Sequence, residues 1–289
     1  MSEIPEAVCL MPLLYFQTTR TFNRTRGRFD LGNGIIIRKT SALEIQEIQE
    51  KRGSKEYPLD HFDIERIGYT LEKKIDPNKL GAFDKAISQF KNVVLAMRLF
   101  KQGAIGYKAV FLLVDGRPYI THDFGVIPRH ASIVPIIKYL EEKSPIFALL
   151  TLNENELAEY VPFYKVTSKR VGREKKWPLP IRYFSRMYES KPYEDVLVDC
   201  MISFEALVFK GERKVREKKT PLALAISMLI GKNSKEREKI KTTLKEAYDI
   251  RNYAVHGKPL PKPPLETATL CWETEDYPRR SIRRLLIEE

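Results

Sequence analysis

The sequence predicts an α+β fold, with a mixed region of strands and helices over residues 1–170 followed by an all-helical bundle over residues 171–289. Two observations predict this division. Up to about residue 165, short apolar runs alternate with amphipathic segments, whereas beyond that point only helical periodicity is readable. The segment Trp-Pro-Leu-Pro at 177–180 lies between the two patterns and is predicted to be a linker. A length of 289 residues allows one large domain or two ordinary ones.

The N-terminal region contains several segments of strand or helix character. Strands are predicted in the apolar start of the chain, MSEIPEAVCLMPLLYF, at 34–39, at 67–75, and in a hairpin made by 107–114, the turn Asp115-Gly116 and the residues after it. Helices are predicted at 40–51 with Thr40 or Ser41 as the N-cap, at 83–101, and at 132–143. This mixture predicts a sheet with helices packed on it.

The C-terminal region reads as helices joined by short connections. They are predicted at 193–209, at 221–230 with Thr220 as N-cap and Gly231 as stop, from a cap at Ser234 to Gly257, and at 278–289 beginning with Pro278. The proline-rich segment 258–264 is expected to be non-helical.

The composition favours a soluble protein with an anionic partner. Lys and Arg number 50 against 38 Asp and Glu, a net charge of +12 that fits nucleic acid or an acidic membrane surface. The three cysteines, Cys9, Cys200 and Cys271, are far apart, which argues for a reducing compartment and against a zinc ribbon. No apolar run approaches the roughly 20 residues that span a bilayer. We therefore expect a cytoplasmic protein with no membrane partner, no metal and no cofactor.

The helix predicted to end at Gly257 carries an unusual residue on its packing face. Ile240, Leu244 and Ala247 fall on one arc, and Arg251 lies near the middle of that arc. A guanidinium there is costly unless it is paired or opens into a wet cleft. Arg251 and His256 differ by about 140° on an ideal helix. They can converge through the length of Arg251 and a frayed last turn, or across two copies of the helix.

Arg251, Asn252 and His256 suit phosphodiester chemistry. Imidazole exchanges a proton near neutral pH, and a guanidinium stabilises charge that builds on phosphate oxygens. An Asn amide can orient the imidazole or hold a phosphate oxygen. RNA supplies its own nucleophile, the 2′-hydroxyl, so this chemistry requires no metal. A second Arg and His with the same spacing, Arg117 and His122, lies in the predicted hairpin, and we interpret it as a coincidence.

Three segments resemble the HEPN domain of the Apea-like group: DVLVDCMISFEALVFKGE, LALAISMLIG and ERxKIxxxLKEAYDIRNYAVHG, within residues 177–289. The resemblance implies an antiparallel helical bundle that dimerises. It also implies a metal-independent endoribonuclease of antiviral defence or toxin systems, which leaves a 2′,3′-cyclic phosphate and a 5′-hydroxyl. The family's catalytic pattern falls on Arg251, Asn252 and His256, and Glu205 would support Arg251 by pairing with it. Other members only bind.

Two basic stretches offer candidate RNA contacts, although such runs are usually solvated linkers or loops. The candidates are Lys169, Arg170, Arg173, Lys175, Lys176, Arg213 and Lys214.

Three hypotheses follow from the sequence. The first is a homodimeric endoribonuclease in which His256 is the general acid and base, Arg251 stabilises the transition state and Asn252 orients. The alternative is a non-catalytic HEPN module that binds nucleotide or RNA or acts as a scaffold. The third makes the N-terminal region the main actor, binding an unknown ligand or protein.

Overall fold

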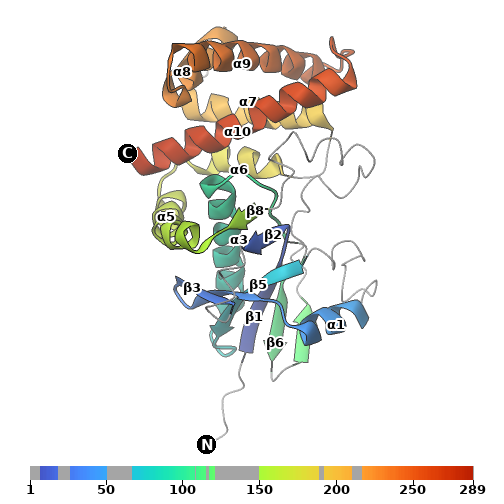
Figure 1. The fold of residues 1–289 in the computed structure, drawn as a ribbon, viewed down its shortest axis with the longest axis vertical. Helices are drawn as coiled ribbons and strands as arrows, with labels where there is room; N and C mark the ends of the chain where they lie inside the picture. Colours follow the sequence, from blue (N-terminus) through green and yellow to red (C-terminus); the bar gives the residue numbers. More distant parts are fainter. Residues whose placement is uncertain are drawn as a thin grey trace, which may run out of the picture. The chain divides into compact units, whose positions relative to one another are not determined.

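The computed structural model describes residues 7–18, 27–50, 67–107, 109–114, 117–120, 150–188, 192–209 and 217–288. The chain divides into two compact units, and among the described residues the first extends to Lys165 and the second begins at Val166. The first holds an antiparallel sheet with helices and the second only helices, which confirms the predicted α+β class (Figure 1). The dividing point lies inside helix α5, Glu154–Arg173.

The described strands of the first unit form two sheets. They are β1 (Ala7–Leu14), β2 (Phe16–Thr18), β3 (Arg28–Gly32), β4 (Ile35–Lys39), β5 (Ile67–Ile75), β6 (Phe111–Val114), β7 (Arg117–Ile120) and β8 (Leu150–Leu152). Six of them make an antiparallel sheet in the order β3-β4-β5-β1-β6-β7. β2 and β8 pair in parallel as a separate ribbon.

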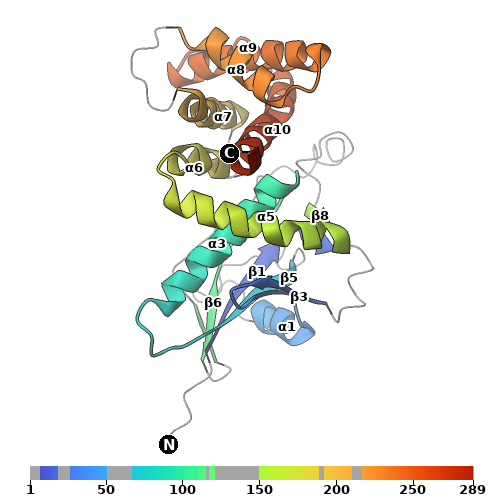
Figure 2. The same ribbon diagram turned by 90° about the vertical axis from the view of Figure 1, so that its left-hand side faces the viewer.

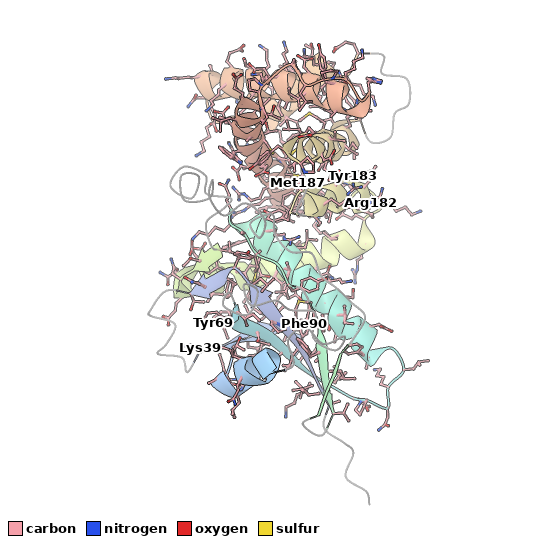
Figure 3. The ribbon with its side chains drawn as sticks, turned by 90° about the vertical axis from the view of Figure 1, so that its right-hand side faces the viewer. Lys39, Tyr69, Phe90, Arg182, Tyr183 and Met187 are labelled. Atoms are coloured by element: carbon pink, nitrogen blue, oxygen red, sulfur yellow. The ribbon has the colours of Figure 1, made fainter. Side chains whose placement is uncertain are left out.

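Helices α1 (Ala42–Glu50) and α3 (Ala82–Phe100) cover opposite faces of the larger sheet (Figure 2). The central strand β1 is therefore apolar on both faces, as a doubly covered strand must be. Leu10 and Leu14 belong to a buried cluster against which Ile45 of α1 packs. On the other side, Phe90 of α3 is fully buried (Figure 3).

The first half of α5 packs on α3 within the first unit. The Tyr160 hydroxyl donates to the carbonyl of Val93 at 2.8 Å, and the Tyr160 ring meets Phe100 edge to face. Asn153 and Glu156 exchange hydrogen bonds with each other's backbone N–H groups at the start of α5. This reciprocal cap explains why the helix begins there.

The described helices of the second unit pack around a common apolar core. They are α6 (Pro178–Arg186), α7 (Tyr193–Val208), α8 (Lys219–Ile230), α9 (Ser234–Val255) and α10 (Pro264–Glu288), together with the end of α5. Core side chains with no exposed surface include Leu197, Cys200, Phe204, Leu222, Ile226, Leu244, Ala247, Cys271 and Ile282.

Ion pairs show that α8 and α10 both run antiparallel to α9. Lys219 at the start of α8 pairs with Asp249 late in α9 at 2.6 Å. Arg280, late in α10, pairs with Glu236 in the first turn of α9 at 2.7 Å. The end of α9 and the start of α10 therefore lie at the same end of the bundle.

Most predicted elements are confirmed, and in several the predicted physical cause is also present. The N-terminal strand, the strands at 34–39 and 67–75, and the helices at 83–101 and 193–209 are all found. Ser41 is the cap of α1, since its hydroxyl accepts from Glu44 N–H and Glu44 accepts from the Ser41 N–H. The hairpin of β6 and β7 is present, but β6 begins only at Phe111.

Four predictions about the second unit were wrong, the fourth being the start of the last helix. The segment 177–180 is not a linker, because Trp177 is 1% exposed and Pro178 occupies the first position of α6. α8 begins at Lys219 rather than after Thr220, since the Glu217 carboxylate accepts from the Thr220 N–H. Asn233 caps α9 in place of Ser234, through a hydrogen bond from Glu236 N–H.

The last helix was predicted to start at Pro278, but α10 starts at Pro264 and carries Pro278 within it. Proline removes one backbone hydrogen bond from a helix interior. Burial of Leu270, Cys271 and Tyr277 on the turns before Pro278 compensates for that loss.

Some predictions concern residues that the structure leaves undescribed. The helix predicted at 132–143, the turn Asp115-Gly116 and His122 lie outside the described residues. Among the helices that are described, none combines the length and apolar character that crossing a membrane would require.

Gly231 ends α8 because of close packing and not because of its φ angle, which is −79°. A Cβ at this position would lie 2.4 Å from Cγ of Arg237 and 2.6 Å from the carbonyl oxygen of Ser227. Arg237 in turn donates to the Gly231 carbonyl at 3.1 Å. The junction between α8 and α9 therefore requires glycine.

We expect Gly231→Ala to destabilise the protein by about 1–3 kcal/mol, as overpacking of a closed site does. Gly172→Ala is the matched control, because a Cβ there meets nothing within 4 Å. In the helix α5 this change should stabilise by about 0.5–1 kcal/mol. Urea unfolding followed by circular dichroism measures both, and equal effects of the two substitutions would contradict the packing argument.

Candidate functional site at the end of helix α9

A glycine-terminated cap closes the last turn of α9 and holds its residues in place. Gly257 has a φ of 61°, which favours glycine. The Lys258 N–H donates to the Tyr253 carbonyl at 2.9 Å, and the Gly257 N–H donates to the Ala254 carbonyl at 3.1 Å. These two bonds define a Schellman cap. The helix is regular to Val255, so the frayed last turn considered from the sequence is absent.

His256 occupies the C-cap position of α9 and its side chain is exposed. Its backbone N–H donates to the Asn252 carbonyl at 3.2 Å. Within the part of the chain that the structure describes, the imidazole makes no hydrogen bond. Its ring is therefore accessible to a ligand.

Arg251 lies partly inside the bundle, with a side chain that is 21% exposed. One terminal nitrogen, Nη1, donates to Oδ1 of Asn252 at 3.1 Å, and the other, Nη2, lies 3.6 Å from Oε1 of Glu205. Its Nε atom is buried and has no hydrogen-bond partner among the described residues. The guanidinium is thus held in position while one of its donors is unused.

Glu205 of α7 joins three helices. Its Oε2 accepts from Nζ of Lys218, just before α8, at 2.9 Å. Its Oε1 accepts from the hydroxyl of Tyr248 in α9 at 3.0 Å. With Arg251 at 3.6 Å, this carboxylate faces two cations and one hydroxyl donor. The pairing of Glu205 with Arg251 expected from the sequence is present in the structure.

The charges around Glu205 are nearly balanced. Lys218 and Arg251 carry two positive charges and Glu205 pairs with both, while Glu217, whose charge also acts on Tyr248, supplies a second carboxylate. Burial and the neighbouring Glu205 charge raise the pKa of Tyr248 to about 12, so its hydroxyl is protonated at neutral pH and donates. The Arg251 guanidinium also lies 5.5 Å from the centre of the Tyr248 ring. Any attraction of an anion to this end of α9 therefore depends on the exposed part of Arg251 and not on a local surplus of charge.

The predicted RNA contacts at 169–176 lie elsewhere in the second unit. Arg170 pairs with Glu174 at 2.7 Å and donates to the carbonyl of Leu286 near the end of α10. The start of α10 lies at the His256 end of the bundle, and at 1.5 Å per residue the helix separates that end from Leu286 by roughly 30 Å. Arg170 therefore contacts the end of α10 that lies far from His256.

The other cations of that stretch have no contact with the α9 site. Lys169, Arg173 and Lys175 are exposed. Lys176 lies 3.5 Å from Glu174 and 5.0 Å from the Trp177 ring. Arg213 and Lys214 lie outside the described residues.

Sequence reasoning missed two residues of the site, Lys218 and Tyr248. Tyr248 precedes Arg251 by three residues and so shares its helix face, a spacing that could have indicated it. Lys218 belongs to a run of basic residues, and nothing in the spacing of that run predicts a contact with Glu205. Only the packing of α7 against α8 and α9 brings it there.

Comparisons with known proteins find no relative of this chain. No protein-family model, no curated protein and no solved structure matches the chain. The chemistry of the site therefore has to be argued from its own residues.

Replacing Glu205 with Gln should lower the pKa of Tyr248 from about 12 toward its ordinary value of 10. Burial remains in this variant, but the negative charge that disfavours the phenolate is removed. The pH titration of the Tyr248 ring carbons by NMR, assigned with Tyr248→Phe, measures the shift.

Glu217→Gln is the control for that titration, because Glu217 also raises the pKa of Tyr248 but ranks last among the causes. Its effect should be the smaller of the two. An unchanged Tyr248 titration in Glu205→Gln would show that Glu205 is not the charge that faces the hydroxyl.

Proposed function

We propose that the protein is a metal-independent endoribonuclease of the HEPN type that acts as a homodimer. The observation that carries the proposal is Arg251, held between Asn252 and Glu205 with a buried Nε that has no partner among the described residues. A phosphate oxygen would contact the part of the Arg251 side chain that remains exposed and share the charge of the guanidinium. The exposed imidazole of His256 lies one and a half turns further along the same helix.

Each residue has one role in the proposed reaction. An imidazole of His256 takes the proton from the 2′-hydroxyl, whose oxygen attacks the adjacent phosphorus. The bond from phosphorus to the 5′-oxygen breaks, and that oxygen receives a proton from a second imidazole in protonated form. Arg251 stabilises the charge on the non-bridging oxygens. Asn252 positions Arg251 through its Oδ1 atom. The products are a 2′,3′-cyclic phosphate and a 5′-hydroxyl.

Helix geometry supports a site built from two copies. Because α9 is regular up to Val255, Arg251 and His256 of one chain point about 140° apart. A two-fold axis near the end of α9 would place the His256 of one copy beside the Arg251 of the other. α8, next to α9, exposes apolar side chains on one face, with Leu224 53% and Met228 54% exposed. Such a face favours contact with a second copy.

RNA cleavage in the presence of EDTA should fall by about 100-fold or more in His256→Ala, the range expected for loss of a general acid and base. The exposed position of His256 predicts that the fold persists, which circular dichroism checks. A labelled single-stranded RNA separated on a gel measures the rate, and the ends of the fragments identify the cyclic phosphate.

His122→Ala is the matched control, because it removes an imidazole with the same spacing from an arginine, Arg117. We expect this variant to cleave at the wild-type rate. Full activity in His256→Ala, or wild-type cleavage that EDTA abolishes, would exclude the proposed mechanism.

Mixing the wild type with His256→Ala tests whether the site is shared between copies. The proposed reaction needs two imidazoles, one from each copy, so a mixed dimer with a single His256 should be inactive. In an equal mixture a quarter of randomly paired dimers are wild type in both copies, so about a quarter of the activity of the same total amount of wild-type protein should remain. Retention of about half of that activity would place a complete site in one chain.

A second candidate is a module that binds RNA or nucleotide without cleaving it. The observation that favours it is the engagement of Arg251 by Asn252 and Glu205, which would suit a fixed phosphate contact. Under this alternative, Arg251→Gln would weaken RNA retention, while His256→Ala would leave it unchanged and no fragments would form with the wild type.

A further inference from the structure

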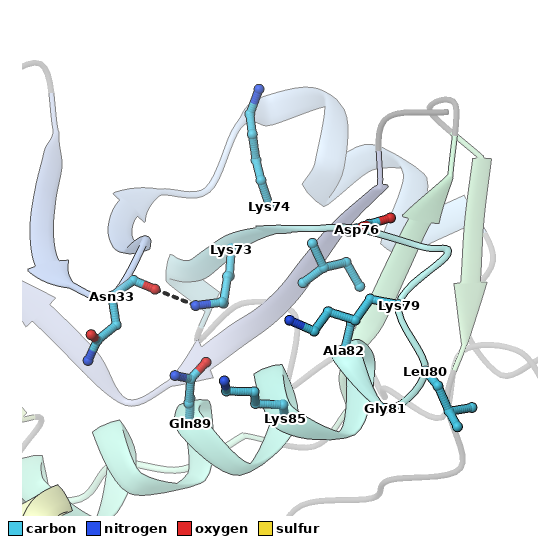
Figure 4. A pocket seen from close by; sticks show the side chains of 11 residues that line it. Asn33, Lys73, Lys74, Asp76, Lys79, Leu80, Gly81, Ala82, Lys85 and Gln89 are labelled. Atoms are coloured by element: carbon cyan, nitrogen blue, oxygen red, sulfur yellow. Dashed lines mark hydrogen bonds between the residues drawn. The ribbon is translucent and has the colours of Figure 1, made fainter. Parts of the chain in front are cut away.

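The first unit contains a solvent-open pocket of about 340 Å³ between the β3–β4 turn, the end of β5 and the first turns of α3 (Figure 4). This volume is at the lower end of the range of small-ligand sites, which begins near 300 Å³. The pocket lies wholly within one compact unit. Its chemistry is independent of the site on α9.

Three lysine side chains converge on the pocket. Lys73 of β5, Lys79 of the following turn and Lys85 of α3 extend into the space between the strand and the helix (Figure 4). Lys73 donates to the carbonyl of Asn33. Among the residues that the structure describes, none of the three lysines has a carboxylate partner. Asp76 also borders the pocket, but its carboxylate accepts from the N–H of Asn78.

The surroundings of the pocket act on the pKa of Lys73. Partial burial and the positive charge of Lys85 lower the pKa of Lys73 below its ordinary value. Like charges brought together without a counter-ion disfavour each other's charged forms. An anion in the pocket would relieve that repulsion.

The start of α3 adds to the positive potential. Gly81 precedes the helix with a φ of 73°, and no side chain caps the first turn. The Ala82 N–H donates to the Lys79 carbonyl at 3.0 Å, and Asp84 lies in the first turn. The next N–H groups and the positive end of the helix dipole favour an anion at such a position. A Cβ at Gly81 would meet nothing within 4 Å, so the approach to the helix start is open.

A side-chain amide completes the lining. Oε1 of Gln89, two turns into α3, is buried and has no hydrogen-bond partner among the described residues. Buried polar atoms in folded proteins are usually satisfied. A ligand that carries a hydroxyl or a protonated oxygen beside its negative charge would supply the missing donor.

We propose that this pocket binds the phosphate group of a small phosphorylated molecule. Three lysines from separate segments and a helix start without a side-chain cap surround one cavity, and the oxygens of a phosphate group accept from both. A purely structural role does not account for the arrangement, because the lysines repel one another and, among the described residues, form no ion pair with a carboxylate. Gln89 would be satisfied only by a hydroxyl on the rest of the ligand, since ionised phosphate oxygens accept and do not donate.

Calorimetric titration of the full-length protein with pyrophosphate tests the proposal, with inorganic phosphate and ATP as further arms. Lys85→Gln and Lys79→Gln should each weaken pyrophosphate binding about tenfold, as loss of one charge-assisted hydrogen bond does. Tighter binding of ATP than of pyrophosphate identifies a nucleotide as the source of the phosphate. Equal affinity for ATP and pyrophosphate would show that the pocket recognises the phosphate groups alone.

Lys74→Gln is the matched control, because Lys74 neighbours Lys73 on β5 but its side chain points away from the pocket (Figure 4). It removes the same charge and should leave binding unchanged. An equal loss in Lys74→Gln and Lys85→Gln would reduce the effect to non-specific attraction by a basic protein and overturn the proposal. Absence of binding to the wild type at millimolar ligand would also overturn it. Neither outcome bears on RNA cleavage by His256.

Discussion

The arrangement of the second unit's site depends on one carboxylate, that of Glu205. It accepts hydrogen bonds from Lys218 before α8 and from Tyr248 in α9, and it lies 3.6 Å from Arg251. Without that negative charge, two cations would face each other in a partly buried space, which is costly. Glu205 therefore permits an arginine on the packing face of α9 and fixes where its guanidinium can meet a ligand.

The two candidate groups of the site, Arg251 and His256, point in different directions from α9. Glu205 is 15% exposed and pairs with Lys218 and with Arg251, whose side chain keeps 21% of its surface exposed. The Schellman cap at Gly257 keeps the helix regular, and this regularity directs His256 away from the guanidinium. The proposed chemistry therefore needs a partner surface. A second copy of the chain would supply this surface, because its own Arg251 and His256 would form the complementary half of the site.

Positive charge recurs in the first unit, but there it is arranged differently. Lys73, Lys79 and Lys85 converge without a carboxylate among the described residues, whereas the cations near Glu205 share one. The pocket thus suits a small anion that enters and leaves, and the α9 site suits a phosphodiester held against a fixed guanidinium.

Local pattern determined the elements whose apolar periodicity is strong, such as β5, α3 and α7, and the end of α9 at Gly257. It also indicated that Arg251 lies on a packing face and needs a partner. It misplaced the start of α8, where Glu217 accepts from the Thr220 N–H, and the start of α10, where burial of neighbouring side chains outweighs the local preference of a proline. Tertiary structure alone decided the contacts of Glu205 with residues 13 and 43 positions away and the convergence of the pocket lysines. Such contacts arise from the packing of distant segments, and no local spacing in the chain encodes them.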